Sequence, residues 1–472
     1  MTVPALTAYP VLVIGGGISG LACAYHLQQA GIPLRLLEAE SRPGGVIATK
    51  VTDGFRFELG PQSFLSTEPL SQLIDALGLK DQLLRANPRA PRYILVGGQL
   101  VPAPLAPPSL LTTPLFSAGT KWRLVTEILR RTRPPAGDES IAAFVRRKFG
   151  DELLNRFVAP FVSGVYAGDP ERLSLRAAFP KVHAFEAQYG SVLRGAMKSR
   201  PAKGAPRSGL CSFRDGMEAL PRTLAARLGN SLLLETSVAG LRHRKANGKP
   251  WFDVEIARHN HRETLTASAV VIATPTNIAS QILLGLSDQF ASLFSRIDYA
   301  PVAVVSACYR REQMQQPPEG FGFLVPRDEG LRVLGTVFNS ALFAGRAPEG
   351  MICVTSFAGG ATDPKLCELS DEQITETICA EVARVVGVTG RPVTTNLYRY
   401  ARALPQYNLG HTNIIKSLEA LTAATPGLFL AGNYLSGPAI GACVEQAGRT
   451  AEAVRVYLAS IGVAGVGALA HA

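Results

Sequence analysis

The feature that most constrains the fold is residues 11–38, where strand, glycine turn, helix and second strand patterns follow in order. Apolar strand formers at 11–14 lead into the pattern G-x-G-x-x-G, and a second strand pattern at 34–37 ends in Glu38. The turn consists of Gly15, Gly16, Gly17, Ile18, Ser19 and Gly20. Glycines there allow a tight turn and let the backbone approach a pyrophosphate, which a helix N-terminus attracts. This order predicts a dinucleotide-binding β-α-β unit in which Glu38 binds ribose hydroxyls. The alternative is a glycine turn without a ligand.

A second glycine pair follows the acid almost at once. Arg42 precedes Gly44 and Gly45 in the stretch S-R-P-G-G. Taken alone, such a stretch is an ordinary surface turn. Behind a β-α-β pattern it resembles the extended FAD fingerprint of the flavin amine oxidase superfamily, in which the glycines lie against the diphosphate and the arginine supplies charge. The resemblance implies FAD as the cofactor.

A strand, a glycine loop and a helix pattern occur again near the C-terminus. The loop runs from Gly432 to Gly441 and contains Pro438, Ala439 and Ile440. Backbone N–H groups at the start of such a helix stabilise the negative charge of a reduced flavin. The segment resembles the flavin-closing motif of FAD oxidoreductases, so we expect Pro438, Ala439 and Ile440 beside the ring. The alternative is a buried C-terminal helix.

Composition narrows the classes of protein. With 47% hydrophobic and 18% charged residues, the 472-residue chain is globular and long enough for two or three subdomains. The net charge of +11 comes from scattered basic residues without a nucleic-acid motif, so we expect an anionic substrate or membrane surface and no nucleic acid. Seven widely spaced cysteines indicate reduced thiols in the cytoplasm. No signal peptide or spanning segment is visible, and His259 and His261 fit a solvated hairpin better than a metal site.

The pattern of strands and helices predicts an α/β fold, α+β overall. Residues 1–86, 206–290 and 408–460 are expected to assemble a discontinuous, Rossmann-like nucleotide domain. Alternating runs at 291–407 predict a second domain with a mixed sheet that binds substrate. Residues 87–205 are expected to form a helical insertion.

Stretches along nearly the whole chain resemble the oxygen-dependent protoporphyrinogen oxidase family. They include FELGPQSF, PRYILVGGQLVP, FVSGVYAGDPERLS, GFGFLVP and GNYLSGPAIGACVE. The positions that resemble the family's FAD contacts are Gly15 through Gly20, Glu38, Arg42, Gly45, Val46, Gly60, Pro61, Gln62, Ser63, Val238 and Gly432. Val46 departs from the pattern, since some members carry a large aromatic residue there. The resemblance implies that FAD is bound non-covalently.

The same resemblance implies substrate contacts. Arg92 matches an arginine that holds a propionate of the tetrapyrrole, and Leu324 and Phe357 match residues that sandwich pyrrole rings. Val337 sits where the family has an aliphatic wall, and Gly164 and Gly168 match a close-approach loop. Arg92 could instead be an exposed arginine on a strand, and Leu324 and Phe357 could be ordinary core residues.

The implied reaction is the oxidation of protoporphyrinogen IX to protoporphyrin IX in three FAD-mediated steps, with dioxygen as acceptor and hydrogen peroxide as product. Coproporphyrinogen III is the alternative substrate. A flavin amine oxidase, a carotenoid desaturase and a non-catalytic flavin-binding assembly factor stay open as other functions, and a homodimer is an open alternative to a monomer. No general base is identified.

A membrane contact is expected as well. Residues 100–118 carry no charge and many prolines, and they precede Lys121, Arg123, Arg130, Arg131 and Arg133. Apolar residues in the lipid interface beside cations give reversible, peripheral binding. The expected location is therefore the cytoplasmic face of a membrane, with Leu110, Leu111 and Leu115 as lipid-facing residues.

Overall fold

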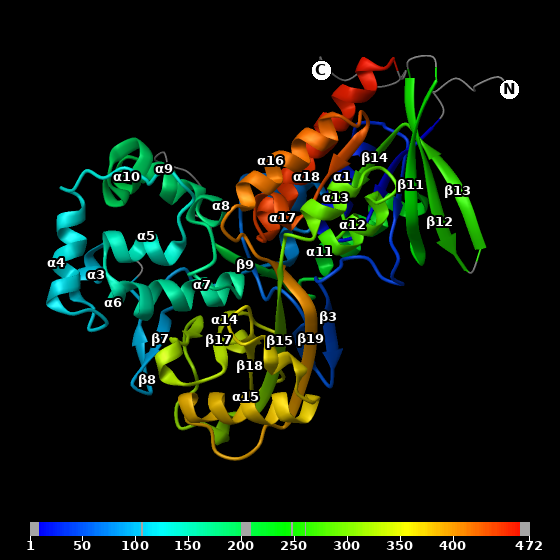
Figure 1. Ribbon diagram of the computed structural model, residues 1–472. Coiled ribbons are helices and arrows are strands. Elements are labelled where there is room, and N and C mark those ends of the chain that lie inside the picture. The colour runs from blue at the N-terminus through cyan, green and yellow to red at the C-terminus, as the bar shows by residue number, and fades with distance from the viewer. Residues whose placement is uncertain (1–8, 105–106, 200–208, 247–248, 260, 463–472) are drawn as a thin grey trace.

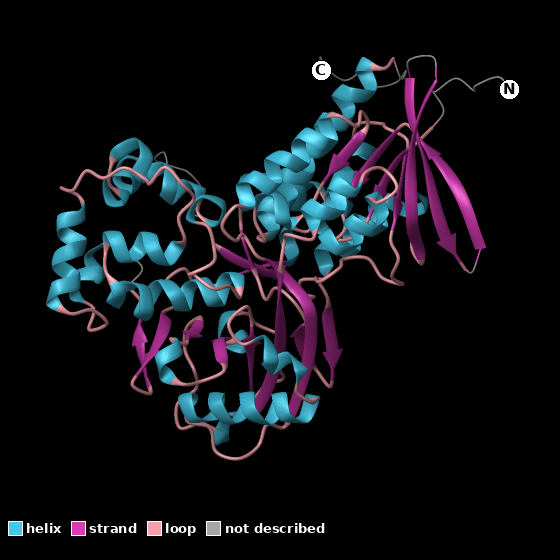
Figure 2. Ribbon diagram, in the orientation of Figure 1, coloured by secondary structure: helices cyan, strands magenta, loops and turns pink. Residues whose placement is uncertain are grey.

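The computed structural model describes residues 9–104, 107–199, 209–246, 249–259 and 261–462. Three bodies of structure are visible in Figure 1: helices on the left, a large sheet at the bottom, and a smaller sheet with its helices at the upper right. Figure 2 shows that most strands lie in the upper right part and in the bottom part. This arrangement is the mixed α/β architecture that the sequence predicts.

The nucleotide sheet is parallel and contains five strands. Its order is β10 (Leu232–Leu233), β2 (Leu34–Leu37), β1 (Val11–Ile14), β14 (Ala269–Ile272) and β20 (Leu428–Leu430). All its neighbours pair in parallel. β1, β2 and β14 are buried almost throughout, as expected for a parallel sheet covered on both faces. The sheet therefore joins segments from three distant parts of the chain.

Helices cover this sheet. α1 (Ile18–Gln29) packs between the sheet, α11 (Ala219–Leu228) and the long C-terminal helix α18 (Ile440–Ser460). The other helices in this part are α2 (Glu68–Ala76), α12 (Thr276–Leu283), α13 (Asp288–Phe294), α16 (His411–Ala423) and α17 (Asn433–Ser436). A three-stranded meander extends from it: β11 (Thr236–Ala246), β12 (Lys249–Arg258) and β13 (His261–Ala267).

The second large sheet is mixed and has seven strands. Its order is β19 (Thr394–Pro405), β15 (Tyr299–Arg310), β18 (Met351–Gly359), β17 (Val333–Val337), β16 (Gly322–Leu324), β7 (Arg92–Val96) and β8 (Gln99–Pro102). Only the β16–β7 pair is parallel among the pairs described. α15 (Asp371–Val386) packs on one face of this sheet. α14 (Asn339–Leu342) follows β17 and contacts β18.

Smaller strands connect the two sheets. β3 (Thr49–Thr52) and β4 (Phe55–Glu58) form a hairpin, and β9 (Leu210–Phe213) lies between β5 (Phe64–Leu65) and β6 (Leu83–Arg85).

The helical part has its own apolar core. It contains α3 (Pro107–Thr112), α4 (Ala118–Glu127), α5 (Ile141–Lys148), α6 (Asp151–Leu153), α7 (Ala159–Tyr166), α8 (Leu175–Ala178), α9 (Pro180–Tyr189) and α10 (Val192–Lys198). A π-helical turn, Leu154–Val158, joins α6 to α7. Residues 92–102, which the expected boundaries group with this part, form β7 and β8 of the seven-stranded sheet instead. The expected boundary at 205–206 lies outside the described residues.

A buried charge cluster ties these helices together. The Lys148 ammonium lies 3.0 Å from a Glu127 carboxylate oxygen and 3.2 Å from one of Glu186. Arg147 bonds to both oxygens of Glu186, and these bonds and the nearby Lys148 charge outweigh burial, so the pKa of Glu186 falls to about 2. Since each buried charge has a partner, the cluster is stable in the interior.

Candidate functional site

The first glycine turn leaves open space at the start of α1. Gly15 has φ +106°, and a Cβ built there would lie 2.8 Å from the Ala273 carbonyl oxygen, so the turn requires glycine. A Cβ on Gly17 would meet no atom within 4 Å. α1 begins without a side-chain cap or an acidic residue in its first turn. Its free N–H groups therefore face space that an anion can fill.

Glu38 closes the turn from the end of β2. One of its carboxylate oxygens accepts a hydrogen bond from the Gly16 amide at 2.5 Å, and the other accepts one from the Glu40 amide at 2.9 Å. The Thr236 amide donates to the Glu38 carbonyl, which places Val238, two residues further along β11, close to the same point. Glu38 thus contacts Gly16, and Val238 follows its partner Thr236 on β11, while the contacts of all three with FAD stay predictions.

The second glycine loop lies directly on the first. The Gly44 amide donates to the Gly16 carbonyl at 2.8 Å, and a Cβ on Gly45 would lie 3.4 Å from the Gly17 Cα. The Arg42 guanidinium donates to the carbonyls of Gly45 and Ile47 within its own loop. Arg42 therefore shapes the loop in this structure, in addition to adding a positive charge there.

The remaining predicted cofactor residues converge on the same region. A Cβ on Gly60 would lie 2.1 Å from the Val46 carbonyl oxygen, so the loop of Gly60 through Ser63 touches the second glycine loop. α18 begins at Ile440 after Ala439, again without a side-chain cap or an acid in its first turn. Burial raises the pKa of the Cys443 thiol to about 11, against a smaller opposing effect of its hydrogen bond with Ser19. That bond joins α18 to α1.

These residues fit a bound dinucleotide. The Thr274 hydroxyl, beside Gly15, is buried and has no hydrogen-bond partner among the described residues. A ligand with polar groups would satisfy this hydroxyl and the free N–H groups at the starts of α1 and α18. The diphosphate would lie at Gly17, the ribose at Glu38, and the flavin near Val46 and the start of α18.

The predicted substrate residues lie on one face of the seven-stranded sheet. Cα partners across neighbouring strands share a face, and so do residues two apart along a strand. One row across the sheet therefore comprises Ile94, Leu324, Gly335, Phe357, Val304 and Tyr398. The adjacent row comprises Arg92, Gly322, Val337, Thr355, Ser306 and Asn396.

This face is more open than the opposite one. Leu324, Val337 and Phe357 are half-buried, whereas Phe323 and Thr336, which point to the α15 side, are buried. Leu324 and Phe357 are two strands apart, about 10 Å at the usual strand spacing. Gly335 lies between them without a side chain. A Cβ on Gly335 would lie 2.9 Å from a Leu324 methyl carbon, so the Leu324 side chain covers Gly335.

α7 lies over this face. A Cβ on Gly164 would lie 2.4 Å from a Leu324 methyl carbon, so the absence of a side chain lets Leu324 pack against the helix. Gly168 has different neighbours, Leu173 and Gln406, and does not contact Leu324 within that distance. Ala167, with φ +47°, ends α7, and its carbonyl accepts from the Ala361 amide. Gly164 therefore contacts the predicted substrate residues, and Gly168 anchors the loop behind them.

Arg92 lies at the side of the face. Its side chain is exposed, and its guanidinium carbon lies 5.1 Å from the centre of the Phe321 ring. A guanidinium over a ring face is held in place but keeps donors for an anion.

Two tyrosines on β19 extend the face toward the glycine loops, and the sequence gives no local signal for them. Tyr398 is 37% exposed, and its ring centre lies 4.7 Å from that of Tyr400. The Tyr400 hydroxyl donates to the Val46 carbonyl at 3.3 Å, and burial raises the pKa of Tyr400. Tyr400 thus connects the substrate face to the loop that we expect beside the flavin.

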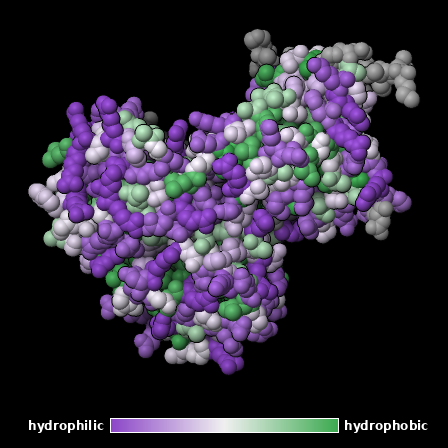
Figure 3. Space-filling view, in the orientation of Figure 1, coloured by the Kyte–Doolittle hydropathy of each residue, from purple (hydrophilic) through white to green (hydrophobic). Residues whose placement is uncertain are grey.

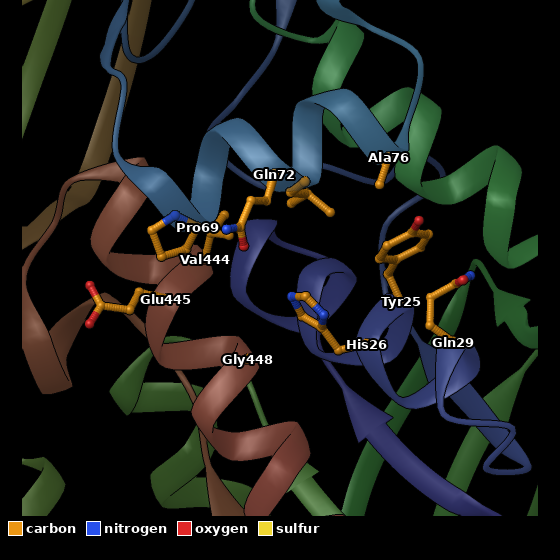
Figure 4. A pocket seen from close by; sticks show the side chains of 10 residues that line it. Tyr25, His26, Gln29, Pro69, Gln72, Ala76, Val444, Glu445 and Gly448 are labelled. Atoms are coloured by element: carbon orange, nitrogen blue, oxygen red, sulfur yellow. The ribbon is translucent and has the colours of Figure 1, made fainter. Parts of the chain in front are cut away.

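A separate groove of about 360 Å³ lies between α1, α2 and α18 (Figure 4). Tyr25, His26, Gln72 and Glu445 are among its lining residues, and none of the predicted site residues is. Burial lowers the pKa of His26. The groove is therefore distinct from the site built by the glycine loops and the sheet face.

Other features bear on the class of site. None of the seven cysteines forms a disulfide. Within the described ranges, no group of three or more His, Cys, Asp or Glu side chains could hold a metal ion. In the same part of the chain, no helix is long and apolar enough to cross a membrane.

Comparisons with known proteins agree with this geometry. The model of a family described as flavin containing amine oxidoreductase matches residues 18–455. The chain is 34% identical to a chloroplastic protoporphyrinogen oxidase 1 of Arabidopsis thaliana, over 95% of this chain and 88% of the relative. It is 30% identical to coproporphyrinogen III oxidase of Bacillus subtilis, over 95% of this chain and 98% of the relative. The crystal structure of a protein titled putative protoporphyrinogen oxidase, from Exiguobacterium sp., superposes with a TM-score of 0.80 at 27% identity. The match covers 96% of this chain and 100% of that chain.

Proposed function

Because the chain belongs to the flavin-containing amine oxidoreductase family and is an FAD-dependent oxidase, we propose that it oxidises protoporphyrinogen IX to protoporphyrin IX. This is an oxidation of a porphyrinogen in tetrapyrrole biosynthesis. The relatives named protoporphyrinogen oxidase and coproporphyrinogen III oxidase support the substrate class, since each covers 95% of the chain.

The observation that carries the proposal is the pair of rows on the seven-stranded sheet. A porphyrinogen is a large apolar macrocycle with anionic propionates, so it needs wide apolar contact and few charges. Leu324, which covers Gly335, and Phe357 on the strand beyond supply apolar contact, and Arg92 lies at the edge of the same face. Arg92 is the only charged side chain in the two rows. It would hold a propionate by a charge-assisted hydrogen bond.

The overall reaction is protoporphyrinogen IX plus three O₂ giving protoporphyrin IX plus three H₂O₂. Over the three steps, the substrate loses three meso hydrogens as hydride and three protons, two from pyrrole nitrogens and one from the fourth meso carbon. FAD, when bound, supplies the two-electron acceptor between the substrate and dioxygen.

The chain's own contribution to this chemistry is binding and orientation. Neither row contains a histidine, a lysine or a carboxylate, so none of these face residues is a general base. We infer that the pyrrole proton passes to solvent and that Leu324, Phe357 and Arg92 act by holding the ring in place. Tyr400 and Gly60 contact the Val46 segment. They would hold the second glycine loop beside the flavin ring.

Coproporphyrinogen III is the second candidate, supported by the Bacillus subtilis relative. It carries four propionates where protoporphyrinogen carries two. Since Arg92 is the single cation of the two rows, the face is better matched to the substrate with fewer anionic groups.

The test is to compare initial rates on both porphyrinogens under oxygen, with hydrogen peroxide measured in parallel. We expect faster oxidation of protoporphyrinogen and one peroxide for each pair of electrons. Faster oxidation of coproporphyrinogen would reverse the assignment. A purified protein that retains FAD but oxidises neither substrate would favour a non-catalytic flavin-binding role.

We also propose a peripheral membrane contact, and α4 is its best-supported element. Trp122 and Val125 of α4, and Leu129 in the turn that follows it, are 67%, 46% and 77% exposed at spacings of three and four residues. Arg123 and Arg130 are exposed beside them. Figure 3 shows that hydrophilic residues dominate the visible surface of this helical part. Leu115, expected at the lipid interface, is 1% exposed and belongs to the helical core instead.

A further inference from the structure

A buried amide pair lies between the loop of Gly60 through Ser63 and the substrate sheet. Asn339, the first residue of α14, is 3% exposed, and Gln62 is 6% exposed. The Asn339 Nδ2 donates to the Gln62 Oε1 at 2.6 Å. The Gln62 Nε2 donates to the carbonyls of Glu58 and Gly60, at 3.0 and 2.9 Å. Asn339 thus supports Gln62, which in turn supports the loop.

The hydrogen bonds fix the orientation of both amides. Two carbonyls face one end of Gln62, so that end must be its NH₂ group. Its oxygen then needs a donor, which requires the Asn339 NH₂ group to point at Gln62. The Asn339 Oδ1 is left as a buried acceptor with no partner among the residues that the structure describes. Buried acceptors are almost always satisfied, so this one calls for a donor from outside the described chain.

The position of Asn339 limits the source of that donor. Asn339 follows Val337 of the substrate face by two residues, and its bonded partner Gln62 belongs to the loop expected beside the flavin. The neighbouring Ser340 hydroxyl is bonded to the Cys353 backbone on β18, which holds α14 against the sheet. Asn339 therefore lies where the cofactor loop meets the substrate strands.

We propose that Asn339 is a positioning residue for Gln62 and that its Oδ1 accepts a hydrogen bond from a ring N–H of a bound heterocycle. A flavin and a porphyrinogen both carry such a group. The substrate alternative rests on the proposed function, whereas the flavin alternative needs only the cofactor. The two sources predict different measurements, because one donor arrives with the cofactor and the other with the substrate.

The experiment compares the wild-type holoenzyme with Asn339→Ala. If the donor is the flavin, the dissociation constant for FAD rises about tenfold and the flavin absorption band shifts, while KM is unchanged. If the donor is the pyrrole N–H, KM for protoporphyrinogen rises about tenfold, while flavin affinity and spectrum are unchanged. Either result supports the proposal and identifies the source.

Thr336→Val is the matched control. It removes a buried hydrogen bond of 2.9 Å between the Thr336 hydroxyl on β17 and the Ser356 hydroxyl on β18. This bond lies on the face of the sheet that points to α15. We expect it to lower stability without changing flavin affinity, spectrum or KM. If Asn339→Ala behaves as this control does, Asn339 is only structural and the proposal is wrong.

Asn339→Ser provides a second variant if the alanine protein does not fold. It keeps a smaller acceptor, so we expect the same direction of change with smaller size. Wild-type flavin affinity, spectrum and KM in this variant would also overturn the proposal. If the wild-type protein oxidises no porphyrinogen, the flavin measurements alone decide, so failure of the proposed function is distinguishable from failure of this inference.

Discussion

Replacing Arg346 with methionine tests the buried ion pair beneath the cofactor loops. Arg346 and Glu58 are each 1% exposed, and the Arg346 Nη1 lies 3.2 Å from a Glu58 oxygen. The same guanidinium donates to the Ser212 hydroxyl and the Phe213 carbonyl, so it holds β9 to β4. Methionine has a similar length but no charge, and it leaves the Glu58 carboxylate buried without its cation.

The expected loss of unfolding free energy follows from that unpaired carboxylate. Removing one partner of a buried pair costs about 3–5 kcal/mol. Glu58 keeps hydrogen bonds from the Met217 amide and the Thr49 hydroxyl. We therefore expect a loss of unfolding free energy at the lower end of this range, about 3 kcal/mol near neutral pH.

The loss should depend on pH. Burial raises the pKa of Glu58, and Arg346 is the largest of the opposing influences. Without Arg346 the pKa of Glu58 rises further, and protonation removes the unpaired charge. The penalty is therefore fully present above the raised pKa and shrinks as the pH falls through it toward the unfolded value.

The assay is urea unfolding of wild type, Arg346→Met and the double variant with Glu58→Gln, at about pH 8 and about pH 5. The double variant should recover part of the loss, because no charge remains buried. A single variant within about 0.5 kcal/mol of wild type at pH 8 would refute the argument, since ordinary surface changes have effects of that size. A loss that is equal at both pH values would also contradict it.

Three further predictions concern ligands. Arg92→Ala should raise KM for protoporphyrinogen about tenfold with unchanged flavin content, and an unchanged KM would place Arg92 outside the site. Acid or heat denaturation should release FAD into the supernatant, and flavin that precipitates with the protein would indicate a covalent bond. The protein should co-sediment with anionic vesicles at low salt, less so after Trp122→Ser and Leu129→Ser. Leu115→Ser should instead lower stability. If this variant alone lost vesicle binding, the proposed membrane contact through Trp122 and Leu129 would be wrong.

Local patterns carried most of the predicted fold. The strands expected at 11–14 and 34–37 are β1 and β2, and the helix between them ends at Gln29, before Gly31 with φ +70°. Strand, glycine turn and helix signals lie next to one another in the sequence here, so short-range propensities agree with the tertiary structure. The same is true of the glycine loop before α18.

Sequence patterns could not predict which distant strands pair with one another. β7 pairs in parallel with β16, so Arg92 lies beside Gly322, more than 200 residues away. The family resemblance indicates Arg92, Leu324 and Phe357, but their shared face follows only from the register of four strands. Asn339 and Tyr400 lack a local signature, because their importance lies in partners on distant loops.

Composition likewise cannot decide which side of a helix meets solvent. Leu115 and Leu129 are the same residue type in adjoining segments, yet one is 1% exposed and the other 77%. The difference arises because Leu115 packs into the core of the helical part, whereas Leu129 lies in the exposed turn after α4.

The strand order of the nucleotide sheet has a consequence for biosynthesis. A ribosome releases β1 and β2 first, but their neighbour β14 ends at residue 272 and the edge strand β20 only at residue 430. α18, which packs on α1, emerges later still. The edge of β1 therefore stays unpaired until β14 has been synthesised, and the edge of β14 stays unpaired until β20 follows. We therefore expect cofactor capture to follow the synthesis of β20 and α18, and the unpaired apolar edge to be open to aggregation until then.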